Sequence, residues 1–146
     1  MQASLLAVLT TSQVNGEIRW PVFVSLQPYS QARERGSPMF TVFLLVKTNP
    51  EWLGFPVAKR FDELALHLQP ILDRHQAVTF KWVDTEFYTA RVTDVWVLEA
   101  ADPHQYELAV EELRETPLWD RYFAVVEILP GVANAYADNY GRAALG

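Results

Sequence analysis

The chain has 146 residues, half of them hydrophobic and 13% aromatic, with a formal net charge of −6 and no cysteine. Its length fits a single domain, and its composition excludes a disordered chain, a coiled coil and a collagen-like fibre. An acidic domain repels phosphate backbones, so we expect no nucleic-acid partner. The lack of cysteine excludes a disulfide framework and a thiol nucleophile and fits a cytoplasmic protein. No apolar run approaches the ~20 residues of a membrane span, so we expect no membrane partner.

Residues 1–38 differ in character from residues 39–146. After the first few positions they are polar and irregular, they contain the hairpin signal Asn15-Gly16, and they end in the linker-like segment 31–38. Two interpretations of 1–38 remain open: an N-terminal extension or tail outside the functional domain, or an added hairpin that packs on the core. In either case we expect the chemistry to lie in an α+β domain at 39–146.

From residue 39 onward, cap and turn residues separate well-patterned segments. Asn49, Pro50 and Glu51 mark the start of one helix, and Asp102 and Pro103 mark the start of another. The predicted elements are a strand at 40–47, a helix from 50 to about 75 that is broken near 54–56 and kinked at Pro70, strands at 78–84 and 88–99, a helix from 103, and a strand at 122–129 that ends at Pro130 and Gly131. This order predicts a ferredoxin-like βαββαβ sandwich of the α+β class.

Alternate residues of the predicted strands divide into two sets. The almost wholly apolar set suits a helix-covered face and comprises Phe40, Val42, Leu44, Val46, Val78, Phe80, Trp82, Trp96, Leu98, Val126 and Ile128. The mixed set comprises Phe43, Leu45, Lys47, Thr79, Lys81, Val83, Arg91, Thr93, Val95, Val97, Glu99, Phe123, Val125 and Glu127. The mixed set is too apolar for open water, so we expect two sheets to pair as a dimeric α+β barrel, which makes the protein a homodimer. A bulge near 86–88 would invert the assignment for the third strand.

Charged residues on the mixed face form the first candidate site. They are Lys47, Lys81, Arg91, Glu99 and Glu127. Inside an apolar barrel, carboxylates and bases acquire shifted pKa values and can act as acid and base. The alternative is a belt of salt bridges at a dimer interface, or ordinary surface charge.

The segment 84–94 is the second candidate site, because five polar side chains lie close together around one turn. They are Asp84, Glu86, Tyr88, Arg91 and Asp94. Arg91 can clamp a carboxylate and Tyr88 can donate to an oxyanion. The alternative is a turn held together by its own side chains. From both sets, the candidate catalytic residues are Arg91, Glu99, Glu127 and Tyr88.

Aromatic residues are the third candidate set, since several together can line a pocket for a flat apolar molecule. The alternative is that they form the core. Tyr136 and Tyr140 follow the last strand, where they can close the barrel mouth or contact a partner subunit. The histidines lack the spacing of a metal pair, so we expect no metal and no cofactor. The candidate ligand-binding residues are Lys47, Lys81, Trp82, Asp84, Glu86, Trp96, Trp119, Tyr136 and Tyr140.

Several segments carry a combined pattern that is more specific than any one of them. These segments are 41–53, 70–75, 84–94, 113–119, 122–131 and 134–140. Together they resemble the darcynin family over residues 39–141, and the resemblance leaves out 1–38. The family comprises small bacterial proteins without an established activity, so the resemblance implies no catalytic residues.

Three functions fit these features. The first is a cofactor-independent acid–base enzyme, similar to a cyclase, isomerase or monooxygenase, acting on a small aromatic or polyketide-like molecule. The second is a protein that binds such a molecule without turnover. The third is a structural or protein-interaction module whose polar barrel face sets the register of a dimer. The comparison with other barrels rests on the fold alone. We favour a small-molecule pocket, and the sequence does not separate binding from catalysis.

Overall fold

A computed structural model of the chain describes residues 39–144. Its elements are β1 (Phe40–Thr48), α1 (Pro50–Gly54), α2 (Val57–His67), α3 (Gln69–Arg74), β2 (Val78–Asp84), β3 (Asp94–Ala100), α4 (Pro103–Arg114), β4 (Phe123–Val132) and α5 (Ala135–Asn139). The hairpin expected at Asn15-Gly16 lies outside the described residues.

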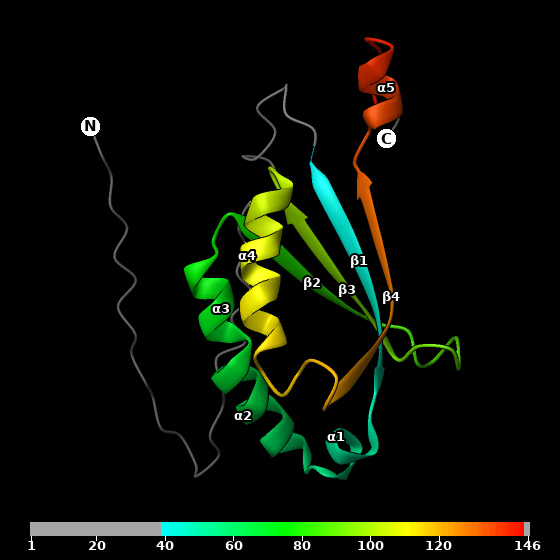
Figure 1. Cartoon of the computed structure of the whole chain (residues 1–146). Helices are drawn as coiled ribbons and strands as arrows, with labels where there is room; N and C mark the ends of the chain where they lie inside the picture. Colours follow the sequence, from blue (N-terminus) through cyan, green and yellow to red (C-terminus); the bar gives the residue numbers. More distant parts are fainter. Residues whose placement is uncertain (1–38, 145–146) are drawn as a thin grey trace, which may run out of the picture. The chain divides into compact units, whose positions relative to one another are not determined.

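The strands form one antiparallel sheet in the order β2-β3-β1-β4. Helices α2, α3 and α4 cover one face of this sheet, and α5 follows β4 at its far end (Figure 1). The predicted ferredoxin-like α+β fold is therefore confirmed. We call the face away from these helices the open face; it carries Phe43, Leu45 and Lys47 of β1 and the residues that alternate in the same phase on the neighbouring strands.

The helix starts follow the prolines of the sequence. Asp102 caps α4, because its side chain accepts a hydrogen bond from the backbone N–H of Gln105. The expected break near 54–56 separates α1 from α2, and Pro70 lies in the first turn of a new helix, α3, where its missing N–H is harmless. Asn49 occupies the N-cap position of α1, but its side chain makes no capping hydrogen bond. Its amide donates instead to the carbonyls of Asp120 and Arg121 at 3.1 Å each, which connects the start of α1 to the turn before β4.

Two predicted strand boundaries are wrong. The third strand begins at Asp94 and not at 88, because residues 85–93 form a loop whose first two N–H groups, of Thr85 and Glu86, both donate to the Thr93 carbonyl. The last strand continues through Pro130 and Gly131 to Val132. Proline is tolerated there because β4 is an edge strand.

The side assigned to the first part of β4 is also wrong. The pairing of β1 with β4 shifts between Leu45, which faces Glu127, and Val46, which faces Val125. This bulge inverts the alternation of the first part of β4, whereas Val95, Val97 and Glu99 of β3 lie on the predicted side. As a result Phe123 and Val125 lie on the helix side, while Glu127 stays on the open face.

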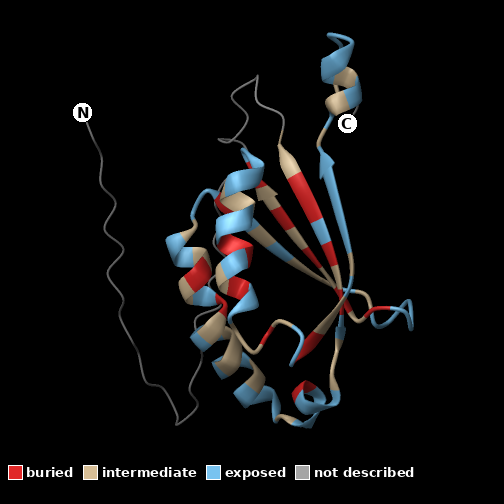
Figure 2. Cartoon of the chain, in the orientation of Figure 1, coloured by how far each residue is buried: buried red, intermediate tan, exposed pale blue. Residues whose placement is uncertain are grey.

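The core lies between the helices and the sheet, and Figure 2 shows its buried residues along β1 and β3 and on α4. Val42, Leu44 and Val46 are fully buried in β1. Phe123 is fully buried as well, and its ring lies 5.0 Å from that of Trp96. Among residues 39–144, no helix combines the length and hydropathy needed to cross a bilayer.

Candidate ligand-binding site

A cavity of about 470 Å³ lies where α1 and α2 meet the ends of the strands. We call it the acid-lined pocket. Its lining residues are Thr48, Trp52, Leu53, Val57, Arg60, Phe61, Leu64, Trp82, Asp84, Glu86, Asp94 and Phe123. A volume of this size suits a small organic molecule.

Asp94 is the most deeply buried charged group of the acid-lined pocket, with 5% of its surface exposed. Its Oδ1 accepts a hydrogen bond from Trp82 Nε1 at 2.8 Å, and its Oδ2 accepts one from Thr93 Oγ1 at 2.6 Å. Burial raises the pKa of Asp94, and the nearby carboxylates of Asp84 and Glu86 raise it further, whereas the two hydrogen bonds act in the opposite direction. The net effect is a carboxyl group that takes up a proton more readily than an ordinary aspartate.

The strand register explains why acidic groups meet here. Asp84 is the last residue of β2, Asp94 is the first residue of β3, and the two are directly paired across the strands. Like charges opposite each other destabilise a sheet. Among the ion pairs of residues 39–144, none involves Asp84, Glu86 or Asp94. The lining also carries Arg60, whose guanidinium donates to the backbone carbonyls at 55 and 53 at 3.1 and 2.9 Å.

Aromatic rings form the apolar wall of the acid-lined pocket. The ring of Phe123 lies 4.9 Å from that of Trp52 and 5.4 Å from that of Trp82. Phe61, on α2, is 68% exposed and lines the same cavity. The site therefore combines a wall of packed aromatic rings, an exposed apolar rim and the buried carboxylate of Asp94.

The charged candidate residues of the open face lie elsewhere. Arg91 and Glu127 form an ion pair, and Lys47 Nζ donates to the Ala90 carbonyl at 3.0 Å. Lys81 is exposed and Glu99 is partly buried on the same face. None of these residues lines the acid-lined pocket. The structure thus brings Arg91 and Glu127 together on the surface of the chain.

The remaining candidate residues are spread over several places. Trp96 is 1% exposed and belongs to the core, whereas Tyr88 is 90% exposed in the loop between β2 and β3. Trp119 lines a second hollow between α4 and β4, together with Tyr106, Glu107, Val110, Glu111, Arg114, Glu115 and Ile128. The rings of Tyr136, in α5, and Tyr140, just after it, lie 5.0 Å apart and tilted to each other, and both residues are exposed. Of the predicted ligand-binding residues, Trp82, Asp84 and Glu86 share one cavity.

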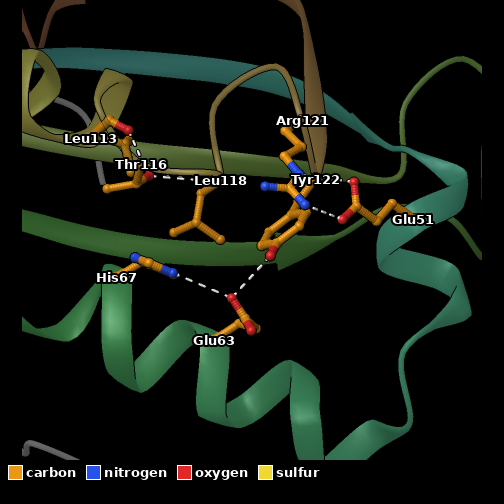
Figure 3. Close-up of polar contacts among 8 residues, drawn as sticks. All are labelled: Glu51, Glu63, His67, Leu113, Thr116, Leu118, Arg121 and Tyr122. Carbon is orange, nitrogen blue, oxygen red and sulfur yellow. Dashed lines mark hydrogen bonds and ion pairs between the residues drawn. The ribbon is translucent and has the colours of Figure 1, made fainter.

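A polar network beside the core joins Tyr122, Glu63 and His67 (Figure 3). Tyr122 donates its hydroxyl to Glu63 Oε2 at 3.1 Å, and His67 Nε2 lies 3.3 Å from the same oxygen. Burial and the neighbouring carboxylate of Glu63 raise the pKa of Tyr122. Neither Glu63 nor His67 lines the acid-lined pocket, and their contacts join α2 to the residue that precedes β4.

Sequence reasoning missed the contribution of α2 to the pocket. Val57, Arg60, Phe61 and Leu64 follow one another at a spacing typical of one helix face. Leu64 packs against the core, whereas Phe61 is 68% exposed at the pocket. Arg60 on the same face was the available signal that this face borders a cavity. Within residues 39–144, no group of three His, Cys, Asp or Glu side chains is arranged to hold a metal ion.

Comparisons with known proteins identify a family and a fold. The family model for Darcynin, a domain of unknown function, matches residues 29–146. A Darcynin homolog from Granulibacter bethesdensis is 62% identical over 109 residues, which is 74% of this chain and 88% of that protein. A Darcynin homolog from Streptomyces avermitilis is 51% identical over 109 residues, which is 74% of this chain and 90% of that protein.

Solved structures with the same fold are much more distant in sequence. A mutant chlorite dismutase from Candidatus Nitrospira defluvii superposes with a TM-score of 0.58 at 13% identity, over 73% of this chain and 44% of that one. A heme-binding protein from Thermus thermophilus gives a TM-score of 0.58 at 17% identity, over 66% of this chain and 40% of that one. The chain thus spans less than half the length of these structures, and the likeness extends to the fold alone.

Proposed function

This chain belongs to the Darcynin family, whose domain has no known function, and we propose that it binds a small organic molecule in the acid-lined pocket. The observation that carries this proposal is a cavity of about 470 Å³ with aromatic walls and one deeply buried carboxylate, that of Asp94. Pockets for small molecules are mostly apolar and contain a few polar groups that orient what they bind. The heme-binding protein of the same fold offers a precedent for ligand binding, at the level of fold.

Haem does not fit the residues of the acid-lined pocket. Haem iron is held in proteins by His, Cys, Met or Tyr side chains. None of these residue types lines this cavity. The carboxylates of Asp84, Glu86 and Asp94 would also repel the propionate groups of haem. We therefore propose a different molecule for this site.

A second proposal concerns the open face, where two copies of the chain can pair into a barrel. Phe43 and Leu129 are 41% and 44% exposed on this face, beside partly buried Val95 and Val97. Apolar surface of this kind favours burial against a partner. In such a dimer the charged residues Arg91, Glu99 and Glu127, with Tyr88 on the neighbouring loop, would lie at or near the interface. Acid–base catalysis by these four residues depends on that assembly.

Blocking the acid-lined pocket tests the first proposal. Val57 is 64% exposed at the rim, so Val57→Trp can fill the cavity without disturbing the core. Leu66→Trp is the matched control, because Leu66 is 65% exposed on the same helix and does not line the cavity.

The probe is indole, and the measurement is its binding by saturation-transfer NMR and calorimetry. We expect indole to bind the natural chain and Leu66→Trp equally, and to lose at least about tenfold in affinity for Val57→Trp. Equal binding to all three proteins, or no binding to any, would contradict the proposed site.

A further inference from the structure

We propose that the acid-lined pocket selects an organic ammonium ion with an apolar body. This inference rests on the proposed function and adds to it the charge of the bound molecule. It follows from the charge of the lining, from the pairing of two aspartates across the sheet, and from the position of the aromatic rings.

The net negative charge of the lining is the first observation that favours a bound cation. Three carboxylates, those of Asp84, Glu86 and Asp94, face one guanidinium, that of Arg60. Arg60 already donates to two backbone carbonyls, and the ion pairs of residues 39–144 include none to the three carboxylates. Water screens the buried charge of Asp94 less than it screens the exposed charges of Asp84 and Glu86, so Asp94 acts most strongly on a bound molecule. The cavity therefore attracts cations and repels anions.

The buried carboxylate of Asp94 is the second ground. Its two oxygens accept hydrogen bonds from neutral donors, Trp82 and Thr93, which leave its charge without a positive counterpart. Asp84 lies directly opposite on β2, so two like charges oppose each other at the cavity. An ammonium group bound here would offset this repulsion and donate to oxygens that retain free lone pairs.

The aromatic rings are the third ground. An ammonium ion is attracted to the faces of aromatic rings, and Trp binds such ions best. Trp82 donates to Asp94 and lines the same cavity, so a ring and a carboxylate lie next to each other. The side chains of Leu53, Val57 and Phe61 are 54%, 64% and 68% exposed at the rim and supply contacts for an apolar body.

A bare metal ion fits this cavity less well than an organic cation. Metal ions with oxygen ligands require several oxygens converging on one point. No three acidic or histidine side chains in the described part of the chain converge in this way. The apolar walls offer no ligand atoms to a bare ion, whereas they can pack against the alkyl or aromatic part of an amine.

The test compares three probes that share one indole ring by calorimetry on the full chain: tryptamine, indole and indole-3-acetate, which are cationic, neutral and anionic at pH 7. We expect tryptamine to bind at least about tenfold more tightly than indole, and indole-3-acetate to bind most weakly. Asp94→Asn, and separately the double variant Asp84→Asn with Glu86→Gln, should reduce this preference for tryptamine over indole. The double variant alters exposed residues only, so it keeps the test decisive if Asp94→Asn does not fold.

Asp62→Asn is the control, because it removes one exposed carboxylate from α2 without altering the pocket lining. If indole binds and tryptamine binds no more tightly, the ammonium inference is wrong and the proposed function stands. If none of the three probes binds, the proposed function fails together with the inference. If Asp62→Asn weakens tryptamine as much as the pocket variants do, the preference reflects overall charge and the inference is wrong.

Discussion

The two faces of the sheet are built from alternate residues of the same strands, yet they have different consequences for the molecule. On the helix side, Val42, Leu44 and Phe123 are completely buried. On the open face, Phe43 keeps 41% of its surface exposed, and the ion pair of Arg91 with Glu127 lies at the surface. The helix side therefore accounts for most of the stability of the folded chain, whereas the open face leaves apolar surface exposed. The acid-lined pocket belongs to the helix side, at the point where its apolar packing ends.

The largest effect is expected from truncating the core of the helix side. Phe123→Ala removes a fully buried ring in contact with Trp96, and should lower the free energy of unfolding by about 3–5 kcal/mol. The free energy of unfolding is measured by urea denaturation, with tryptophan fluorescence as the signal. Phe43→Ala is the matched variant on the open face, and it should lower the free energy by less than about half as much in dilute solution. An equal loss for both variants would show that the two faces contribute equally to the free energy of unfolding.

The open face can be tested directly by placing a charge at its centre. Val97 is paired with Phe43 on one side and Lys81 on the other, so its side chain lies in the middle of this face. If two sheets pair here, the natural chain should be a dimer by light scattering, and Val97→Glu should be a folded monomer. Val97→Thr keeps the β-branched shape and should remain dimeric. A natural chain that is monomeric at high concentration would refute the barrel.

The raised pKa of Asp94 predicts a smaller, pH-dependent effect on stability. Between the ordinary value of 3.8 and the raised value, the folded state binds more protons than the unfolded state, so Asp94 lowers stability as the pH rises. Asp94→Asn removes this charge and should melt at a higher temperature than the natural chain at pH 7. The difference should shrink as the pH falls through the raised pKa, and vanish below the ordinary value of 3.8. A difference that grows on acidification would mean that the folded state holds Asp94 ionised more firmly than the unfolded chain does.

The smallest effect is expected from the exposed ion pair of the open face. Arg91 and Glu127 have side chains that are 62% and 39% exposed, and exposed pairs contribute ~0–1 kcal/mol because water and salt screen them. Arg91→Ala should therefore change the melting temperature by only a few degrees, and less at high salt. A large loss of stability at all salt concentrations would mean that Arg91 holds its loop in place.

The order of the elements could be predicted from sequence because it depends on local signals. Asp102 caps α4 as expected, and prolines separate α1, α2 and α3. The apolar alternation of β1 also identified its buried face correctly. These features depend on neighbours within a few residues, so a single sequence contains them.

Features that depend on distant pairing could not be predicted in the same way. The bulge opposite Leu45 and Val46 arises only when β1 and β4 pair, and it moves Phe123 to the core. The pairing of Asp84 with Asp94 is likewise a matter of strand register. The segment 84–94 is chemically unusual in the sequence alone, but the cavity beside it needs α2, whose residues are distant in sequence.

The course of β4 has a consequence for the behaviour of the protein at high concentration. In the sheet formed by residues 39–144, β4 lies at the edge, and its Val126, Ile128, Leu129 and Val132 side chains are 43–45% exposed. An apolar edge strand of this kind is a template for strand addition and aggregation. Pro130 interrupts the row of backbone donors within this stretch. Pro130, which the sequence predicts to end the strand, therefore lies inside it and makes the addition of a further strand less favourable.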